Sequence, residues 1–320
     1  MTTAPTSVEP RLLLSAPTRG DRIFRGVLSG SASLTMVILA LIGLYLLSGA
    51  LPELRADGLS FFTSFRWTEL GPFGIGAVLY WTVAIALISL TIALPVSISL
   101  ALAITQYASA RVAAVLTILI DLLAALPSLI FGIWGLIFLQ PRMVPVSEWL
   151  SQHLGFIPIF NVHGTNFKSS AFIAGVVSSL MIMPIITSIA REVFSRSPQG
   201  EIEATYALGA TRWSVIKTVV LPFGRGGIVG GAMLGLGRAL GETIVVVLIV
   251  SPTFLISPRI LESGANSVAA LIALRIGEAH GIAVNALMAA GLTLFLVTLL
   301  VNMIASAIVS RSRSGAGVEL

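Results

Sequence analysis

The 320 residues are 56% hydrophobic and only 10% charged, whereas about a quarter of the residues of a soluble domain carry charge. This composition excludes an ordinary soluble enzyme and predicts a membrane protein. We attribute the net charge of +5 to basic loops that face anionic lipid, not to nucleic-acid binding. The absence of cysteine excludes disulfides and thiolate chemistry.

Six apolar segments are long enough to cross a bilayer, which takes about 20 residues of α-helix for a hydrocarbon core of about 30 Å. The sequence therefore predicts an all-α membrane protein with six transmembrane helices. Four segments carry no charged residue, the third contains Asp121, and the fifth contains Arg238 and Glu242. The predicted helices lie near residues 27–50, 74–104, 112–139, 170–191, 226–251 and 283–309.

These segments predict one membrane domain with no soluble second domain. Longer loops are expected at residues 141–169 and 252–281, the second with a short helix within Asn266–Leu274. Pro95 and Pro127 are interpreted as kinks inside helices. The expected divisions are a cytoplasmic tail at 1–25 (disordered over 1–20), a first helix and external loop at 26–73, a transmembrane domain at 74–310 that includes a cytoplasmic loop at 195–222, and a cytoplasmic tail at 311–320.

The distribution of Lys and Arg predicts the orientation in the plasma (inner) membrane. With the N-terminus inside, twelve basic residues fall on the cytoplasmic side and six on the outer side, and Arg238 lies within the membrane. This bias places both termini and the 195–222 loop in the cytoplasm. We expect no cleavable signal peptide, because the first apolar segment is too long for one and no small-residue cleavage site follows it.

The most distinctive stretch is the polar interruption Glu203–Pro222 between two apolar segments. Its pattern predicts two short helices broken at Gly209, with Thr211 capping the second helix and Pro222 ending it. A linker without a task would be short or disordered, so we interpret this stretch as a rigid platform.

The platform resembles the EAA loop of ABC importer permeases, in which Glu-Ala, a Gly six residues after the Glu, and a distal Leu-Pro recur. The resemblance implies the fold of type I importer permeases and a loop that docks on a separate cytoplasmic ATPase. No Gly-x-x-x-x-Gly-Lys-Ser/Thr occurs in the chain, so we expect no cofactor here and ATP and Mg²⁺ in the partner ATPase. The docking residues implied are Glu203, Ala204, Leu208, Gly209, Ala210, Leu221 and Pro222.

Gly227, Gly231 and Gly235 recur every four residues and therefore share one helix face. Helices in lipid associate through close backbone approach at small residues, so this face should meet another helix, within the chain or across a subunit boundary. His153, His163 and His280 show no metal-ligand spacing, and we expect no metal site. We interpret Asp121 as forming a structural hydrogen bond to a neighbouring helix. The alternative is that it is a polar residue of the transport path.

Arg238 lies thirteen residues beyond Arg225, about 20 Å into the predicted helix and close to the bilayer midplane. An Arg there costs about 3 kcal/mol on insertion scales, and Glu242, four residues on, is within its reach. An ion pair that only stabilises the bundle is one interpretation. We favour an anion path lined by Arg238, whose planar guanidinium suits tetrahedral oxyanions. The sequence does not decide whether Glu242 holds the Arg238 rotamer or is displaced by the anion.

Three stretches resemble the PstC-type permeases of phosphate-specific ABC importers: Arg238–Thr243, Ala125–Gly135 and the aromatic run Phe61–Trp67. The resemblance extends over roughly residues 20 to 310. It implies a role in phosphate transport for Arg238 and Glu242. It also implies a second, PstA-like permease, two copies of a PstB-like ATPase and an external PstS-like phosphate-binding protein as partners, and no enzymatic site in this chain.

Three rival functions remain open from the residues. One buried Arg does not separate phosphate from sulfate or molybdate. An ion-coupled anion carrier or channel working alone would leave the 203–222 loop unexplained, and we find no internal repeat of the kind common in secondary transporters. A membrane sensor or scaffold would need the loop but not Arg238.

Overall fold

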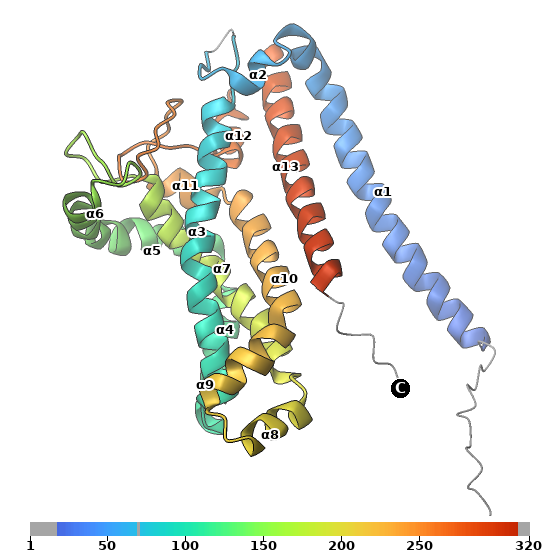
Figure 1. Ribbon diagram of the computed structural model, residues 1–320. Helices are drawn as coiled ribbons and strands as arrows, with labels where there is room; N and C mark the ends of the chain where they lie inside the picture. Colours follow the sequence, from blue (N-terminus) through green and yellow to red (C-terminus); the bar gives the residue numbers. More distant parts are fainter. Residues whose placement is uncertain (1–17, 69–70, 313–320) are drawn as a thin grey trace, which may run out of the picture. The chain divides into compact units, whose positions relative to one another are not determined.

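The computed structural model describes residues 18–68 and 71–312 (Figure 1). This described part is all-α, with three isolated β-bridges and no strand. Six of its helices are long and apolar enough to cross a membrane. They are Arg19–Ala56, Gly76–Tyr107, Ser128–Leu154, Ala171–Ser195, Arg212–Leu240 and Ile282–Ile308. The predicted all-α fold with six membrane helices is thus confirmed, although the first, third and fifth predicted helices have different bounds.

The chain divides into two compact units, at residue 45. The described part of the first unit is residues 18–45, the beginning of α1 (Arg19–Ala56). This helix starts with a capping box, in which Asp21 N–H donates to Thr18 Oγ1 at 3.2 Å and Thr18 N–H donates to Asp21 Oδ2 at 2.9 Å. The first helix therefore begins eight residues before its predicted start near residue 27, and residues 1–17 of the predicted tail lie outside the described residues.

The second unit, from residue 46, contains the rest of the described chain. Its helices, in chain order, are α2 (Ser60–Thr63), α3 (Gly76–Leu102) with the π-helical extension η1 (Ala103–Tyr107), α4 (Ala110–Ala125), α5 (Ser128–Trp134), the π-helical η2 (Gly135–Leu139), α6 (Gln140–Leu154), α7 (Ala171–Ser195), α8 (Gln199–Ala207), α9 (Arg212–Val215), the π-helical η3 (Ile216–Val220), α10 (Leu221–Leu240), α11 (Ile244–Ile249), α12 (Val268–Arg275) and α13 (Ile282–Ser312).

Helix α7 is the centre of this unit, because it packs against both α3 and α10. Its core-facing residues Ile173, Ile182 and Ile186 are fully buried. In Figure 1, α8 and α9 lie at one end of the bundle and α2 and α12 at the other. The bundle therefore presents two different ends, one built from the 195–222 loop and one from the segments that carry α2 and α12.

The third predicted helix, near 112–139, is wrong as one continuous element. Helix α4 ends at Ala125, Leu126 and Pro127 are extended, and α5 begins at Ser128. Proline lacks the N–H that an α-helix needs and forces the residue before it out of the helical region, so Pro127 interrupts the segment and does not merely kink it. The helix then resumes, and α6 occupies the first part of the predicted 141–169 loop.

The fifth predicted helix, near 226–251, is wrong at its start and in its interior. Pro222 does not end the short helix that Thr211 begins. That helix continues from α9 through η3 into α10. Just before Pro222, the Leu221 N–H donates to the Ile216 carbonyl five residues back, and this wider winding accommodates a ring that would clash in a regular α-helix. The helix stops at Leu240, and α11 starts only at Ile244.

The three glycines of α10 face α7 of the same chain. A Cβ on Gly227 would lie 2.3 Å from Val193 Cγ2, and one on Gly235 would lie 2.9 Å from Ile186 Cδ1. Gly231 is in ordinary contact distance of Ile189, at 3.4 Å. The glycine row is therefore an intrachain seam in which the two backbones approach closely, as expected of small residues in membrane bundles.

We predict that Gly227→Ala destabilises the second unit by about 1–3 kcal/mol, because Val193 is β-branched and has little freedom to move away from the added methyl. Thermal unfolding of the purified chain in detergent measures this loss. Gly230→Ala on the same helix is the matched control. A Cβ there meets nothing within 4 Å, so this variant should keep the wild-type midpoint or exceed it slightly. Equal midpoints for the two variants would contradict the seam.

Candidate functional site

The 195–222 loop folds as a helical corner. Helix α8 ends at Ala207, Gly209 has a φ of +81°, and α9 begins after Thr211, whose side chain accepts a hydrogen bond from Ser214 N–H at 3.3 Å. A left-handed residue is what a helix C-terminus requires, and glycine adopts it without strain. The break at Gly209 and the cap at Thr211 lie where the sequence places them.

An apolar cluster fastens this corner to the bundle. Fully buried Phe194 from the end of α7 packs there with Val215 and Ile216 from the α9–η3 helix, and Ala101 of α3 joins them. The guanidinium of Arg212 also lies 5.9 Å from the ring centroid of Tyr107. The corner is therefore rigidly mounted on the ends of α3 and α7.

The predicted docking residues separate into two groups. Glu203, Ala204, Leu208 and Gly209 are exposed on the α8 side of the corner, and the side chain of Leu208 is 89% exposed. Leu221 and Ala210, by contrast, pack against the apolar cluster, whereas Pro222 is exposed. The first group offers a surface, and Leu221 and Ala210 belong to its support.

Two exposed aromatic side chains, Tyr206 and Trp213, extend this surface, and the sequence reasoning did not single them out. An aromatic residue two positions after the capping Thr211 in a polar loop was the available signal. Large exposed apolar side chains at the polar end of a bundle mark an interaction site. We define the docking face as Glu203, Tyr206, Leu208 and Trp213.

Arg238 lies two residues before the end of α10 and is exposed. It follows Leu234 by one turn, and Leu234 is 60% exposed, so the two form one open strip of the helix that continues to Gly241. Among the described residues, Arg238 has no ion pair and no side-chain hydrogen bond. Its positive charge is therefore left uncompensated within this part of the chain.

Glu242 does not pair with Arg238. The helix breaks between them, and the carboxylate turns the other way: its Oε1 accepts a hydrogen bond from Val245 N–H at 3.1 Å, in the first turn of α11. Glu242 is only 7% exposed. The i, i+4 ion pair, one of the interpretations that the sequence leaves open, is therefore not formed among the described residues, because the i+4 geometry holds only where the helix is continuous.

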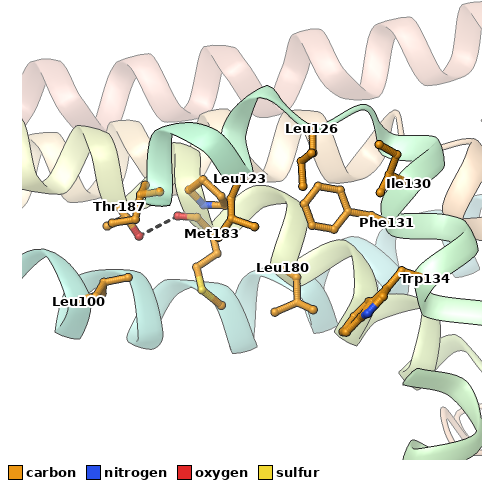
Figure 2. A pocket seen from close by; sticks show the side chains of 11 residues that line it. Leu100, Leu123, Leu126, Ile130, Phe131, Trp134, Leu180, Met183 and Thr187 are labelled. Carbon is orange, nitrogen blue, oxygen red and sulfur yellow. Dashed lines mark hydrogen bonds between the residues drawn. The ribbon is translucent and has the colours of Figure 1, made fainter. Parts of the chain in front are cut away.

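A cavity of about 310 Å³ lies beside the α4–α5 break, between α3, α4, α5 and α7. Figure 2 shows its lining, in which Leu, Ile, Phe, Met and Trp side chains surround the space. The Thr187 hydroxyl is turned onto the Met183 carbonyl at 2.8 Å. With an almost entirely apolar lining and its one hydroxyl already donating to Met183, the cavity offers an oxyanion too few hydrogen-bond donors to offset desolvation, which argues against it as the anion site.

Asp121 is exposed on α4, and no hydrogen bond from its side chain to another described residue is present. The predicted structural hydrogen bond to a neighbouring helix is therefore wrong for the chain by itself. His153, His163 and His280 are exposed. Within residues 18–68 and 71–312, no cluster of three His, Cys, Asp or Glu residues could hold a metal ion.

Residues 93–314 match a protein family described as binding-protein-dependent transport system inner membrane component. The chain is 38% identical over 304 residues to the phosphate transport system permease protein PstC 2 of Mycobacterium tuberculosis, covering 93% of this chain and 94% of that protein. It is 37% identical over 291 residues to the phosphate transport system permease protein PstC of Xylella fastidiosa, covering 90% of each chain.

Solved structures share the fold. A chain of a bacterial alginate ABC transporter, in complex with an alginate-pentasaccharide-bound periplasmic protein, superposes with a TM-score of 0.61 at 21% identity, covering 92% of this chain and 98% of that one. A chain of the inward-facing MetNI methionine ABC transporter superposes with a TM-score of 0.53 at 16% identity, covering 74% of this chain and 95% of that one. At these identities the likeness concerns the fold.

We predict that Gly209→Ala costs about 1 kcal/mol of local stability at the corner, because an L-residue is strained at a φ of +81° while the surrounding space is open. Limited proteolysis of the 195–222 loop should become several-fold faster. Gly200→Ala in the first turn of α8 also meets open space but needs no left-handed backbone, so its proteolysis rate should not rise. Identical rates in both variants would show that the corner is not held by Gly209.

Proposed function

Because the chain belongs to the family of binding-protein-dependent transport system inner membrane components, we propose that it is the permease subunit of an ATP-driven phosphate importer. In this proposal it forms half of the translocation pathway and has no ATPase site of its own. The names of its relatives support phosphate as the cargo. The structural observation that carries the proposal is the exposed, uncompensated Arg238 at the end of α10.

An exposed arginine in an apolar helix cannot face acyl chains, where it would cost about 3 kcal/mol or more. The strip of Leu234, Arg238 and Gly241 must therefore face another protein or a water-filled path. A second, PstA-like permease that packs across this strip would supply the neighbouring protein and, between the two subunits, the water-filled path. Side chains that line such a path are exposed when one subunit is considered alone. We place the phosphate path there.

Arg238 binds the anion with the planar donor fork of its guanidinium, which matches two oxygens of a tetrahedral oxyanion. Glu242 contributes by holding the first turn of α11 and not by neutralising Arg238. The anion is then the counter-ion that the described part of the chain lacks. This division of roles replaces the two alternatives that the sequence leaves open for Glu242.

The docking face receives the cytoplasmic ATPase. The excess of basic residues in the loops at this end supports an orientation with both termini inside, in the plasma (inner) membrane. Two copies of a PstB-like ATPase bind ATP and Mg²⁺, and a PstS-like protein delivers phosphate at the other end. This chain itself binds no cofactor in the proposed complex.

Movement follows from the continuity of α9, η3 and α10. When ATP closes the ATPase pair, the docking face moves with it, and the helix that begins at Arg212 carries this displacement to Arg238 without an intervening joint. The Arg238 strip turns from inward-facing to outward-facing, receives phosphate from the external binding protein and returns after hydrolysis. Alternating access of this kind needs no chemistry in the chain itself.

We predict that Arg238→Ala lowers phosphate uptake by at least about a hundredfold, because the anion loses its charged hydrogen-bond donors at the membrane-embedded site. Uptake of labelled phosphate into proteoliposomes that contain the whole complex measures this loss. Arg238→Lys keeps the charge but not the fork and should retain part of the uptake. If added sulfate or molybdate competed with labelled phosphate as well as unlabelled phosphate does, the complex would not be specific for phosphate and another oxyanion would be a candidate cargo.

The matched control for this experiment is Arg225→Ala, which removes an exposed arginine from the same helix thirteen residues earlier. Its uptake should stay within about twofold of wild type. Complex assembly, followed by copurification of all subunits, should be unchanged in both variants. Normal phosphate uptake by Arg238→Ala would overturn the proposed path.

We also predict that Leu208→Glu releases the ATPase from the permease. Leu208 is the most exposed of the three large apolar side chains of the docking face, and a carboxylate buried there against an apolar surface costs several kcal/mol. Copurification of the ATPase with the tagged chain should fall at least tenfold, to about background. Leu208→Met conserves the apolar volume and should retain binding, whereas binding by the Glu variant would place the docking surface elsewhere.

A further inference from the structure

A chain of buried polar groups crosses the bundle at the end that carries α12. Thr82 of α3, Ser267 at the N-cap of α12 and Glu242 at the α10–α11 break are 2%, 2% and 7% exposed. Most of the other core positions are apolar. Buried polar groups are retained where every member is hydrogen-bonded, and each of these three is.

The hydroxyls of Thr82 and Ser267 each connect two elements. Val268 N–H of α12 donates to Thr82 Oγ1 at 2.9 Å, and the same hydroxyl donates to the Val78 carbonyl of α3 at 2.7 Å. Ser267 Oγ accepts a hydrogen bond from Ala270 N–H at 3.1 Å and donates to the Glu242 carbonyl at 3.4 Å. Both hydroxyls therefore use donor and acceptor at once, which is what a junction between elements requires.

Glu242 is fixed from both of its sides. Its carbonyl is bound by Ser267, and its carboxylate binds Val245 N–H in α11. Its own N–H donates to the Ala239 carbonyl at 3.2 Å, inside the turn that carries Arg238. A shift of Ser267 is consequently delivered to the last turn of α10.

The loop before α12 is closed on itself and is also anchored to its surroundings, since Phe172 N–H of α7 donates to the Ile260 carbonyl at 3.0 Å and Ser263 N–H donates to the Asn166 carbonyl at 3.2 Å. Ala265 N–H donates to the Ser251 carbonyl and Thr253 N–H to the Ala265 carbonyl, both at 3.2 Å, which closes the 251–265 loop on itself. Trp81 Nε1–H of α3 donates to the Leu255 carbonyl at 2.8 Å. Leu255 itself is 73% exposed, so the tip of the loop is available to a partner.

We propose that Ser267 is a positioning residue that transmits displacement of the 251–265 loop to the Gly241–Thr243 break and so to Arg238. The contact it uses, Ser267 Oγ to the Glu242 carbonyl, joins the N-cap of α12 directly to the break at the end of α10. The inference rests on the proposed function of Arg238. It adds that docking of the phosphate-carrying external protein on the 251–265 loop is felt at the anion site through Ser267 and Thr82.

The test uses the assembled complex in proteoliposomes and compares ATP hydrolysis with and without the phosphate-loaded external protein. Ser267→Ala should leave the rate without that protein unchanged per complex, and should lower the stimulated rate and phosphate uptake by about tenfold. Ser267→Thr restores the hydroxyl and should rescue both within about twofold. A role in folding alone would lower the two hydrolysis rates in proportion and would not yield this change in their ratio.

Ser170→Ala is the matched control, because Ser170 is also a fully buried N-cap serine whose hydroxyl accepts from Ile173 N–H at 3.4 Å and makes no contact with the break. Its backbone pairs with Ser263 of the same loop, and this pairing does not involve the side chain that the substitution removes. This variant should keep the wild-type stimulation ratio. Thr82→Val and Thr82→Ser repeat the comparison from the α3 side and decide the question if Ser267→Ala does not assemble.

The two failures are distinguishable when Arg238→Ala is measured in parallel. If Ser267→Ala and Thr82→Val retain full stimulation while Arg238→Ala abolishes uptake, the positioning role is overturned and the anion path stands. If Arg238→Ala transports phosphate normally, the proposed anion path at Arg238 fails, and the positioning role of Ser267, which rests on that path, fails with it. A loss of stimulation in Ser170→Ala equal to that in Ser267→Ala would likewise overturn the inference, since capping alone would then explain the effect.

Discussion

The architecture depends on one constraint: a helix that is interrupted inside an apolar medium must satisfy the backbone groups that the interruption frees. The chain does so differently at each site. At Pro127 single tight turns close the two ends, with Leu126 N–H on the Leu123 carbonyl and Ile130 N–H on the Pro127 carbonyl. At Pro222 a wider turn keeps the helix continuous. At Glu242 a carboxylate supplies the missing acceptor. The last solution also fixes Arg238 beside the break.

The glycine seam and the continuous α9–η3–α10 helix together limit the directions in which α10 can be displaced. Close approach at Gly227 and Gly235 leaves α10 no room to shift toward α7, so α10 moves either with α7 or along the seam. The apolar cluster around Phe194 fastens α7 and the start of the same long helix to the docking corner. Motion at the corner and position at Arg238 are therefore coupled by packing, without a hinge between them.

The sequence predicts features that depend on local chemistry and misses those that depend on the surroundings. The apolar segments, the break at Gly209 and the cap at Thr211 follow from composition and from what glycine and threonine do to a backbone. Pro222 was misjudged, because whether a proline ends a helix or is absorbed by a π-turn depends on packing on either side. The break before α11 was missed for a similar reason: Gly241 is tolerated inside helices, and only the buried Glu242 and its partner Ser267 make a stop there favourable.

The break between α10 and α11 separates the carboxylate of Glu242 from the guanidinium of Arg238. In a continuous helix the carboxylate of Glu242 would lie one turn from Arg238 and largely cancel its charge, and a neutral pair gives an oxyanion little reason to bind. In the structure the carboxylate is buried and accepts a hydrogen bond from Val245 N–H. Arg238 remains exposed and has no ion-pair partner among the described residues, so its guanidinium is free to pair with a ligand or with a neighbouring subunit. An apolar helix that keeps an unneutralised guanidinium open in this way is suited to bind an anion transiently, since a permanent counter-ion would block the exchange that transport requires.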